Sequence, residues 1–241
     1  MSDALFDDPR LAGVYDALHP DRSDLDAYIA IIDEVHASSV LDVGCGTGTF
    51  ACRLAAGGLA VVGVDPALAS LYVARGKPHA DRVRWIHGDA TTLPPLAVDA
   101  AVMTANVAQV FVTDDEWLAT LAGIHAALRQ GGRLVFESRV PERRAWERLT
   151  PALTRTTVDV AGIGTVESWG DLLAVDGDLV TFRSVTRLHR DALDIETRST
   201  LRFRDRDELL ASLDATGYDI VDVRDAPDRP GLEHVFIADR R

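Results

Sequence analysis

Three glycines stand at alternate positions in the stretch LDVGCGTGTF, residues 41–50, directly after a short apolar run. An apolar run followed by glycines is typical of the turn between a buried strand and a helix. Glycine has no Cβ and adopts positive φ readily, so a ligand can approach the backbone of Gly44, Gly46 and Gly48 closely. The first N–H groups of the following helix can bind a polar or negative group. We therefore expect a ligand-binding turn here.

Two aspartates end the next two apolar segments along the chain. Asp65 ends VVGVD, and Asp89 follows VRWIH in the stretch HGDATTLP. Ligands bind at the carboxyl ends of the strands in an open parallel sheet. A carboxylate at Asp65 can accept hydrogen bonds from both hydroxyls of a ribose. Asp89 can accept a hydrogen bond from an exocyclic amine such as that of adenine. These residues predict a nucleoside with a polar tail; the alternative is that Asp65 only caps the helix that begins at Pro66.

Strand-like and helix-like segments alternate through most of the chain, which predicts an α/β fold. We expect buried strands at 40–43, 61–64, 83–86, 98–103 and 133–137, with helices at 24–36, 50–56, 66–75 and from 113 to the glycines at 131–132. This alternation indicates a mostly parallel sheet covered on both faces. A helix at 206–215 and strands at 218–223 and 233–238 close the chain. The loop between these last strands is too short for a crossover helix, so they should pair antiparallel.

Residues 154–204 have a different pattern, in which polar and apolar side chains alternate with period two. The stretch VDGDLV, residues 175–180, is a turn signal between two such runs. We expect a small antiparallel β insertion of about three strands. The chain then reads as a single domain with an N-terminal helical cap (1–37), a ligand-binding core (38–140), the insertion (154–204) and a closing helix and hairpin (205–241).

Four stretches in fixed order, VLDVGCGTG, VVGVDP, HGDATTLP and GGRLVFE, resemble the ordered motifs of class I S-adenosylmethionine-dependent methyltransferases of the small-molecule type. The resemblance covers roughly residues 38–140 and extends more loosely to the closing helix and strand pair. It implies a Rossmann-like, doubly wound, seven-stranded sheet with an antiparallel last strand. It also implies methyl transfer by in-line displacement from S-adenosylmethionine to a small-molecule acceptor, with S-adenosylhomocysteine as the product. The β insertion resembles the variable substrate-binding additions of such enzymes, as an acceptor roof or a dimer contact.

The same resemblance implies cofactor contacts in the N-terminal segment and at the ends of four strands. They are Tyr15, folding over the cofactor; Asp42, Gly44 and Gly46 at its methionine part, with Cys45, Thr47 and Gly48 in the same turn; Asp65 at the ribose; Pro66, Ala67, Asp89 and Ala90 around the adenine; and Thr104 and Asn106 beside the sulfonium.

Methyl transfer depends largely on holding the acceptor in line with the methyl group, and it requires no metal. No Cys/His cluster has the spacing of a metal site. A hydroxyl or ammonium acceptor also needs a base. Glu137 is the first candidate because it ends the fifth strand at the edge where substrates bind, although it could simply be a loop or cap carboxylate. His19 is the second candidate, and His189 and His234 are weaker ones.

The composition of the chain argues against some classes of binding partner. A formal net charge of -13 disfavours binding of bulk nucleic acid, because phosphate backbones attract clustered Lys and Arg. No apolar run has the length of a membrane span, and the N-terminus lacks a signal-peptide pattern. Two cysteines, Cys45 and Cys52, are too close together for a disulfide framework. We expect a cytoplasmic protein with a small-molecule partner, no nucleic acid or membrane partner, and a possible homodimer.

Three other functions stay open. A nicotinamide-dependent oxidoreductase would prefer G-x-G-x-x-G, whereas this turn has the spacing G-x-G-x-G. A non-catalytic protein that binds S-adenosylmethionine would combine affinity for that cofactor with an acceptor pocket closed by bulky side chains. For a methyltransferase that acts on protein or RNA, the net charge opposes RNA, and the chain lacks an obvious recognition module.

Overall fold

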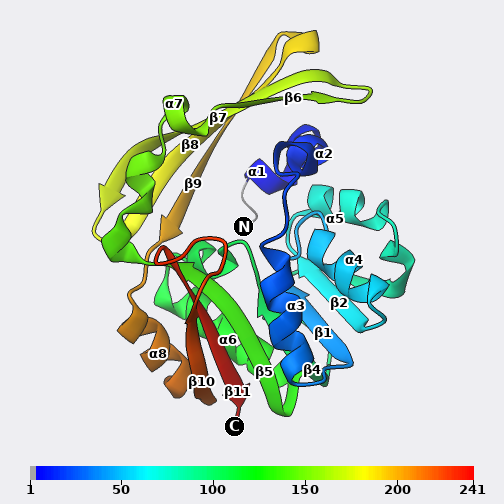
Figure 1. Ribbon diagram of the computed structural model, residues 1–241, viewed down its shortest axis with the longest axis vertical. Helices are drawn as coiled ribbons and strands as arrows, with labels where there is room; N and C mark the ends of the chain where they lie inside the picture. The colour runs from blue at the N-terminus through cyan, green and yellow to red at the C-terminus, as the bar shows by residue number, and fades with distance from the viewer. Residues whose placement is uncertain (1–3) are drawn as a thin grey trace.

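A seven-stranded sheet forms the centre of the computed structural model, which describes residues 4–241, with side chains from Phe6 onward (Figure 1). The strands lie in the order β10-β11-β5-β4-β1-β2-β3, and β11 alone runs antiparallel to its neighbours. Their bounds are β1 Ser39–Val43, β2 Ala60–Asp65, β3 Val83–His87, β4 Val98–Met103, β5 Leu128–Arg139, β10 Tyr218–Asp225 and β11 Glu233–Arg240. This arrangement confirms the predicted fold class, including the antiparallel final pair.

Helices cover both faces of this sheet, as expected from the alternation of strands and helices. Apolar side chains of α3 and α4 pack on one face, and those of α6 and α8 pack on the other. The α-helices are α1 Ala4–Asp7, α2 Pro9–Leu18, α3 Leu25–Glu34, α4 Thr49–Ala56, α5 Leu68–Arg75, α6 Asp114–Ala127, α7 Pro151–Thr154 and α8 Arg206–Ala215. Short 3-10 turns are η1 Ala80–Arg82, η2 Val107–Val110, η3 Pro141–Arg143, η4 Ala145–Arg148 and η5 His189–Asp191. The carboxyl ends of β1 to β5 are thereby left at one edge.

A second, separate sheet contains four antiparallel strands in the order β6-β7-β8-β9. They are β6 Thr156–Val160, β7 Gly164–Asp176, β8 Leu179–Leu188 and β9 Leu193–Arg202. The expectation of about three strands was therefore wrong by one. The first hairpin was missed because β6 and β7 are joined by residues 161–163, Ala-Gly-Ile, which lack the Asn-Gly or Asp-Gly signal of a tight hairpin.

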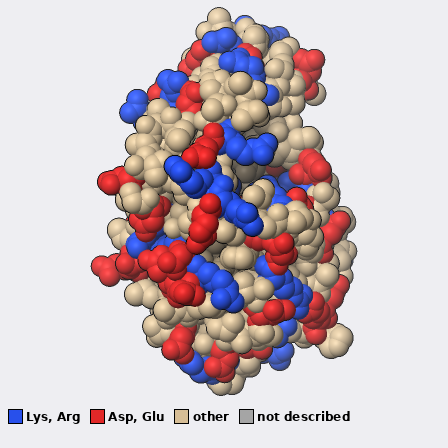
Figure 2. Space-filling model, turned by 60° about the vertical axis from the view of Figure 1, so that its left-hand side comes forward, with Lys and Arg blue, Asp and Glu red and all other residues tan. Residues whose placement is uncertain are grey.

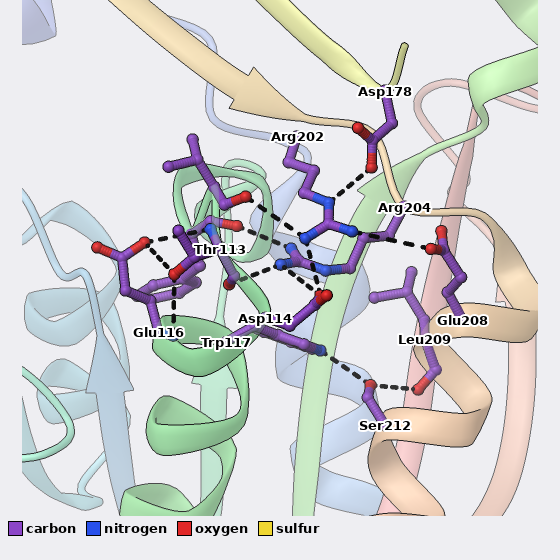
Figure 3. A network of polar contacts seen from close by, with 12 residues as sticks. Thr113, Asp114, Glu116, Trp117, Asp178, Arg202, Arg204, Glu208, Leu209 and Ser212 are labelled. Atoms are coloured by element: carbon purple, nitrogen blue, oxygen red, sulfur yellow. Dashed lines mark hydrogen bonds and ion pairs between the residues drawn. The ribbon is translucent and has the colours of Figure 1, made fainter.

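Two arginines at the end of β9 tie the four-stranded sheet to the core (Figure 3). The buried Arg204 guanidinium donates to the carbonyl oxygen of Thr113 at 2.9 Å, just before α6. Arg202 pairs with Asp114 at 2.8 Å and with Asp178 at 2.6 Å. Asp114 begins α6, and Asp178 lies in the turn between β7 and β8. Buried charge-assisted hydrogen bonds of this kind hold a defined geometry, so the sheet is fixed relative to α6.

The N-terminal helices lie between the four-stranded sheet and the core (Figure 1). Helix α1 contacts α5 and β9, and α2 contacts α5 and β6. Val14 and Leu18 of α2 pack with Val166 and Leu188 of the four-stranded sheet. Helix α2 therefore connects both parts of the molecule above the carboxyl ends of the core strands.

Acidic and basic side chains are interspersed over the face shown in Figure 2. Many of them form ion pairs, such as Arg183 with Asp171 and Arg187 with Asp194 on the four-stranded sheet. Within residues 4–241, no helix combines the length and the apolar character that crossing a bilayer requires.

Candidate functional site

The glycine turn joins β1 to α4 and is held against the end of β2. The backbone N–H groups of Gly44 and Cys45 both donate to the carbonyl oxygen of Val64, at 2.9 and 3.1 Å. Gly48 has φ +77°, and a Cβ on it would lie 2.6 Å from the Trp85 ring, so the fold itself requires glycine there. Gly46 has φ +53°, but a Cβ on it would meet no atom within 4 Å. The open space beside Gly46 is the kind of gap that a bound ligand can fill.

Asp65 ends β2 as predicted and is buried beneath this turn. Its carboxylate accepts hydrogen bonds from the backbone N–H groups of Gly46 at 2.7 Å and Ala67 at 2.8 Å. Burial raises the pKa of Asp65, and these two hydrogen bonds oppose that rise. The carboxylate therefore shapes the turn and the start of the α5 connection, and its remaining lone pairs can accept further donors. The sequence analysis treated capping of the helix and ligand binding by Asp65 as alternatives. In this geometry one carboxylate can do both.

Asp42, in β1, carries an unsatisfied buried oxygen. The residue is 1% exposed, and its Oδ2 has no hydrogen-bond partner among the described residues. Burial, together with the nearby Asp65, raises the pKa of Asp42 to about 7. A buried acceptor without a donor is costly, so a ligand that brings an ammonium or hydroxyl group stabilises this site. This orphaned oxygen fits the predicted contact with a polar ligand tail.

Asp89 and Ala90 follow β3 at the same edge of the sheet. Asp89 is exposed, and its Oδ1 accepts the backbone N–H and the hydroxyl of Thr91, at 2.8 and 2.6 Å. Ala90 is buried against α6, where a Cβ on Gly123 would lie 2.1 Å from the Ala90 carbonyl oxygen. Pro66 is exposed, and its carbonyl oxygen lies 3.1 Å from Nε2 of His87. Adjacent strand pairing thus brings Asp42, Asp65 and Asp89 to one edge.

Helix α2 is fastened to the glycine turn by a polar cluster of four residues. The Thr47 hydroxyl donates to Asp16 Oδ1 at 2.6 Å, and Lys77 Nζ lies 2.6 Å from Asp16 Oδ2. Lys77, the only lysine of the chain, also donates to the Thr49 hydroxyl at 2.6 Å. The neighbouring Tyr15 lines the cavity described below, and its contact with a cofactor stays a prediction. The Thr47 side chain, in contrast, is occupied by the protein's own helix.

A cavity of about 320 Å³ lies between the α2–α3 connection and the ends of β4, β5 and β11. It brings together three residues that the sequence analysis singled out, Tyr15, His19 and Glu137. The rings of Tyr15 and His19 pack with centroids 4.7 Å apart. Burial and the Arg22 guanidinium lower the pKa of His19, so its imidazole is neutral at pH 7. The volume is sufficient for a small organic molecule.

Glu137 is 6% exposed and sits at the inner wall of this cavity. Its Oε1 accepts the backbone N–H of Asn106 at 2.8 Å. Ala105 and Asn106 both have positive φ, 59° and 61°, an uncommon conformation for residues other than glycine. Burial, then the nearby Glu233 carboxylate, raises the pKa of Glu137 to about 7. A carboxylate with such a pKa can accept and release a proton near neutral pH.

Glu233 is a site residue that the sequence analysis missed. It is 2% exposed, and its Oε1 accepts from the Asn106 side chain at 3.1 Å and from Arg229 at 2.6 Å. Arg139 approaches the same oxygen at 3.5 Å. A signal was present, because Glu233 begins the expected last strand. An antiparallel β11 starts at the edge where β5 ends, which brings its first residue next to Glu137.

The two weaker base candidates lie away from this cavity. His189 is 3.4 Å from Glu167 on the four-stranded sheet. His234 lines a different cavity, of about 340 Å³, with Arg143 and Arg206. Thr104 and Asn106 are buried directly after β4, beside the cavity residue Ala105.

Comparison with known proteins shows which family the segment with these elements resembles. Residues 40–132, which carry the glycine turn, Asp65 and Asp89, match the family model described as a methyltransferase domain. A putative methyltransferase of Geobacillus sp. (strain WCH70) is 32% identical over 104 residues, which is 42% of this chain and 42% of that protein. The alignment thus spans less than half of that curated relative. The family match confirms the resemblance drawn from the sequence motifs.

Solved structures extend the likeness over nearly the whole chain, at the level of the fold. An S-adenosylmethionine-dependent methyltransferase from Clostridium acetobutylicum superposes with a TM-score of 0.74 at 17% identity, covering 96% of this chain and 98% of the other. An amino pentose methyltransferase from Micromonospora echinaspora, solved with S-adenosylmethionine bound, gives 0.74 at 24% identity, covering 95% and 97%.

Proposed function

We propose that this chain, which carries a methyltransferase domain at residues 40–132, transfers a methyl group from S-adenosylmethionine to a small-molecule acceptor. One observation carries the proposal. Within the matched segment, the glycine turn leaves open space at Gly46, and Asp42 of the preceding strand has a buried oxygen with no donor among the described residues. A ligand with a slender polar part fits both features.

The cofactor residues follow from this geometry and from the motif resemblance. Asp42 and the backbone of Gly44 and Gly46 hold the methionine part, and Asp65 accepts the ribose hydroxyls. Pro66, Ala67, Asp89 and Ala90 surround the adenine, while Thr104 and Asn106 lie beside the sulfonium and Tyr15 covers it. Bound S-adenosylmethionine supplies an electrophilic methyl group on a positively charged sulfur.

The chain's own residues then position the acceptor and manage its proton. The cavity beside Ala105 confines the acceptor, which removes much of the entropic barrier to an in-line attack. Glu137 accepts the acceptor's proton on its carboxylate, and the Asn106 backbone N–H holds that carboxylate in place at 2.8 Å. Helix α2, which brings Tyr15 to the cavity, limits access of water from its side, and the four-stranded sheet packs behind this helix.

The size and position of the cavity support a small acceptor. About 320 Å³ accommodates a metabolite-sized molecule and excludes a folded macromolecule from the reacting centre. The amino pentose methyltransferase among the structural neighbours acts on a small acceptor, according to its name, which supports the same class here.

Calorimetric titration of the purified protein tests the proposal directly. S-adenosylmethionine and S-adenosylhomocysteine should bind with micromolar dissociation constants, and NAD should not bind. Failure of both sulfur compounds to bind a folded protein would refute the cofactor assignment, and tight binding of NAD would favour an oxidoreductase.

A further inference from the structure

The charged groups that line the cavity of about 320 Å³ are mostly acidic. Five carboxylates line it, those of Asp21, Asp24, Glu137, Asp228 and Glu233. Only two guanidinium groups join them. A cavity with an excess of one charge attracts a ligand of the opposite charge.

Ion pairs within the protein neutralise most of these carboxylates. Arg22 donates to both oxygens of Asp24 at 3.1 Å. Arg229 lies 2.6 Å from Glu233 and 3.3 Å from Asp228. Arg139, outside the lining, lies 3.5 Å from the same Glu233. Together the three guanidinium groups balance the charges of Asp24, Asp228 and Glu233.

Two carboxylates remain, and they differ in burial. Asp21 is exposed at the rim, where it accepts the backbone N–H of Ser23 at 3.0 Å. Glu137 is 6% exposed, and only its Oε1 is engaged, by the Asn106 N–H. Among residues 4–241, no hydrogen bond reaches Glu137 Oε2. Because Glu137 lines the cavity, a cationic donor in the cavity can supply the hydrogen bond that this oxygen lacks.

We propose that the acceptor is a small amine, which enters this cavity as its ammonium ion and donates to Glu137. The inference rests on the proposed methyl transfer and names its substrate class. The ring of Tyr15 gives the ammonium a second favourable surface through cation–π attraction. The neutral imidazole of His19 does not repel it.

The acidity of the acceptor group distinguishes an amine from an alcohol or a phenol. Glu137 has a pKa of about 7, and an alkylammonium has one of about 10, so proton transfer between them is only moderately uphill. An aliphatic alcohol holds its proton about as tightly as water, far more tightly than an ammonium ion does. A phenol is as acidic as the ammonium, at about 10, but loses its proton to become an anion among carboxylates. Only the amine suits both the base and the charge of the cavity.

The reaction step balances without any further reagent. The ammonium gives one proton to Glu137 and becomes a neutral amine. The nitrogen lone pair then attacks the methyl carbon, forming the C–N bond as the C–S bond breaks and its electron pair stays on sulfur. The product leaves as a methylated ammonium, and Glu137 afterwards releases its proton to water.

Fragment binding to the protein in the presence of S-adenosylhomocysteine tests this inference. Benzylamine, benzyl alcohol and phenol share one ring and differ in the donor group, and each can be titrated by ligand-observed NMR. We expect benzylamine to bind at least about tenfold more tightly than benzyl alcohol and phenol. Glu137→Gln should abolish that preference, whereas Glu137→Asp should retain part of it and Glu142→Gln, outside the cavity, should retain all of it.

Equal binding of the three fragments, or a preference that survives Glu137→Gln, overturns the inference. Thermal melting and S-adenosylhomocysteine affinity of each variant show whether it is folded. If that cofactor product does not bind at all, the proposed function fails by itself, and the fragment preference still reports on the cavity. If it binds and the preference is absent, only the amine assignment fails.

Discussion

The Asp65 carboxylate accepts the backbone N–H of Gly46 at 2.7 Å, across the turn that connects β1 to α4. The same carboxylate accepts the N–H of Ala67 at 2.8 Å. One buried side chain at the end of β2 therefore sets the shape of the turn beside β1. Because the space next to Gly46 is open, this contact positions the backbone against which a cofactor would lie.

Asp65→Ala should weaken S-adenosylhomocysteine binding by at least about tenfold, because it removes a charged acceptor for the ribose and the support of the turn. Asp65→Asn, which keeps one acceptor oxygen, should give an intermediate affinity. Isothermal titration calorimetry measures both. Asp81→Ala, an exposed carboxylate in η1, serves as the control. Wild-type affinity in Asp65→Ala would contradict the assignment.

Gly46→Ala and Gly48→Ala should fail in different ways. A methyl group at Gly48 would lie 2.6 Å from Trp85 and 2.7 Å from Ala74 with φ at +77°, so that variant should lose several kcal/mol of unfolding free energy. The methyl group at Gly46 meets no protein atom, so Gly46→Ala should lose only about 1 kcal/mol of unfolding free energy. Its cofactor affinity should nevertheless fall steeply, because the methyl group fills the space for the ligand. Chemical denaturation and calorimetry separate the two losses. Undiminished binding by Gly46→Ala would show that no ligand lies there.

Methyl transfer should depend on pH through Glu137. The base must be ionised, and its pKa is about 7, so kcat/KM should rise tenfold per pH unit below about 7 and level off above it. Glu137→Gln should lower kcat by about 10²–10⁴-fold and remove this limb, while S-adenosylhomocysteine affinity stays unchanged. Rates with labelled S-adenosylmethionine over pH 5–9 provide the measurement. An unaltered profile in the variant would exclude Glu137 as the base.

Lys77→Met should loosen helix α2 from the glycine turn. The variant loses the 2.6 Å pair with Asp16 and the hydrogen bond to Thr49. Both pair members are partly exposed, so the loss should be about 0.5–1 kcal/mol, which corresponds to an about twofold to fivefold weaker cofactor affinity and a faster dissociation rate. Arg10→Met, which removes a cation whose pair with Asp8 stays within the start of α2, is the matched control. Stopped-flow dissociation rates that are equal in the two variants would rule out this role for Lys77.

Local sequence determined the elements and one edge of the site. The turn at Gly44–Gly48 and the aspartates Asp65 and Asp89 could be predicted because glycine conformations and strand ends depend on neighbours a few residues away. Parallel strands bring their carboxyl ends to one edge, so the position of Glu137 at that edge also followed from the strand pattern. The antiparallel direction of β11 was predictable from the length of its loop.

Only the tertiary structure decided which distant side chains meet. Glu233 raises the pKa of Glu137, Lys77 joins α2 to the turn through Asp16, and Arg204 ties β9 to α6. The same is true of Glu137 Oε2, whose lack of a donor depends on where Arg22 and Arg229 find their partners. Such contacts join residues far apart in the chain and are selected by close packing of whole elements, which local patterns do not encode. Burial then sets the pKa values of Asp42 and Glu137, because desolvation exists only in the folded protein.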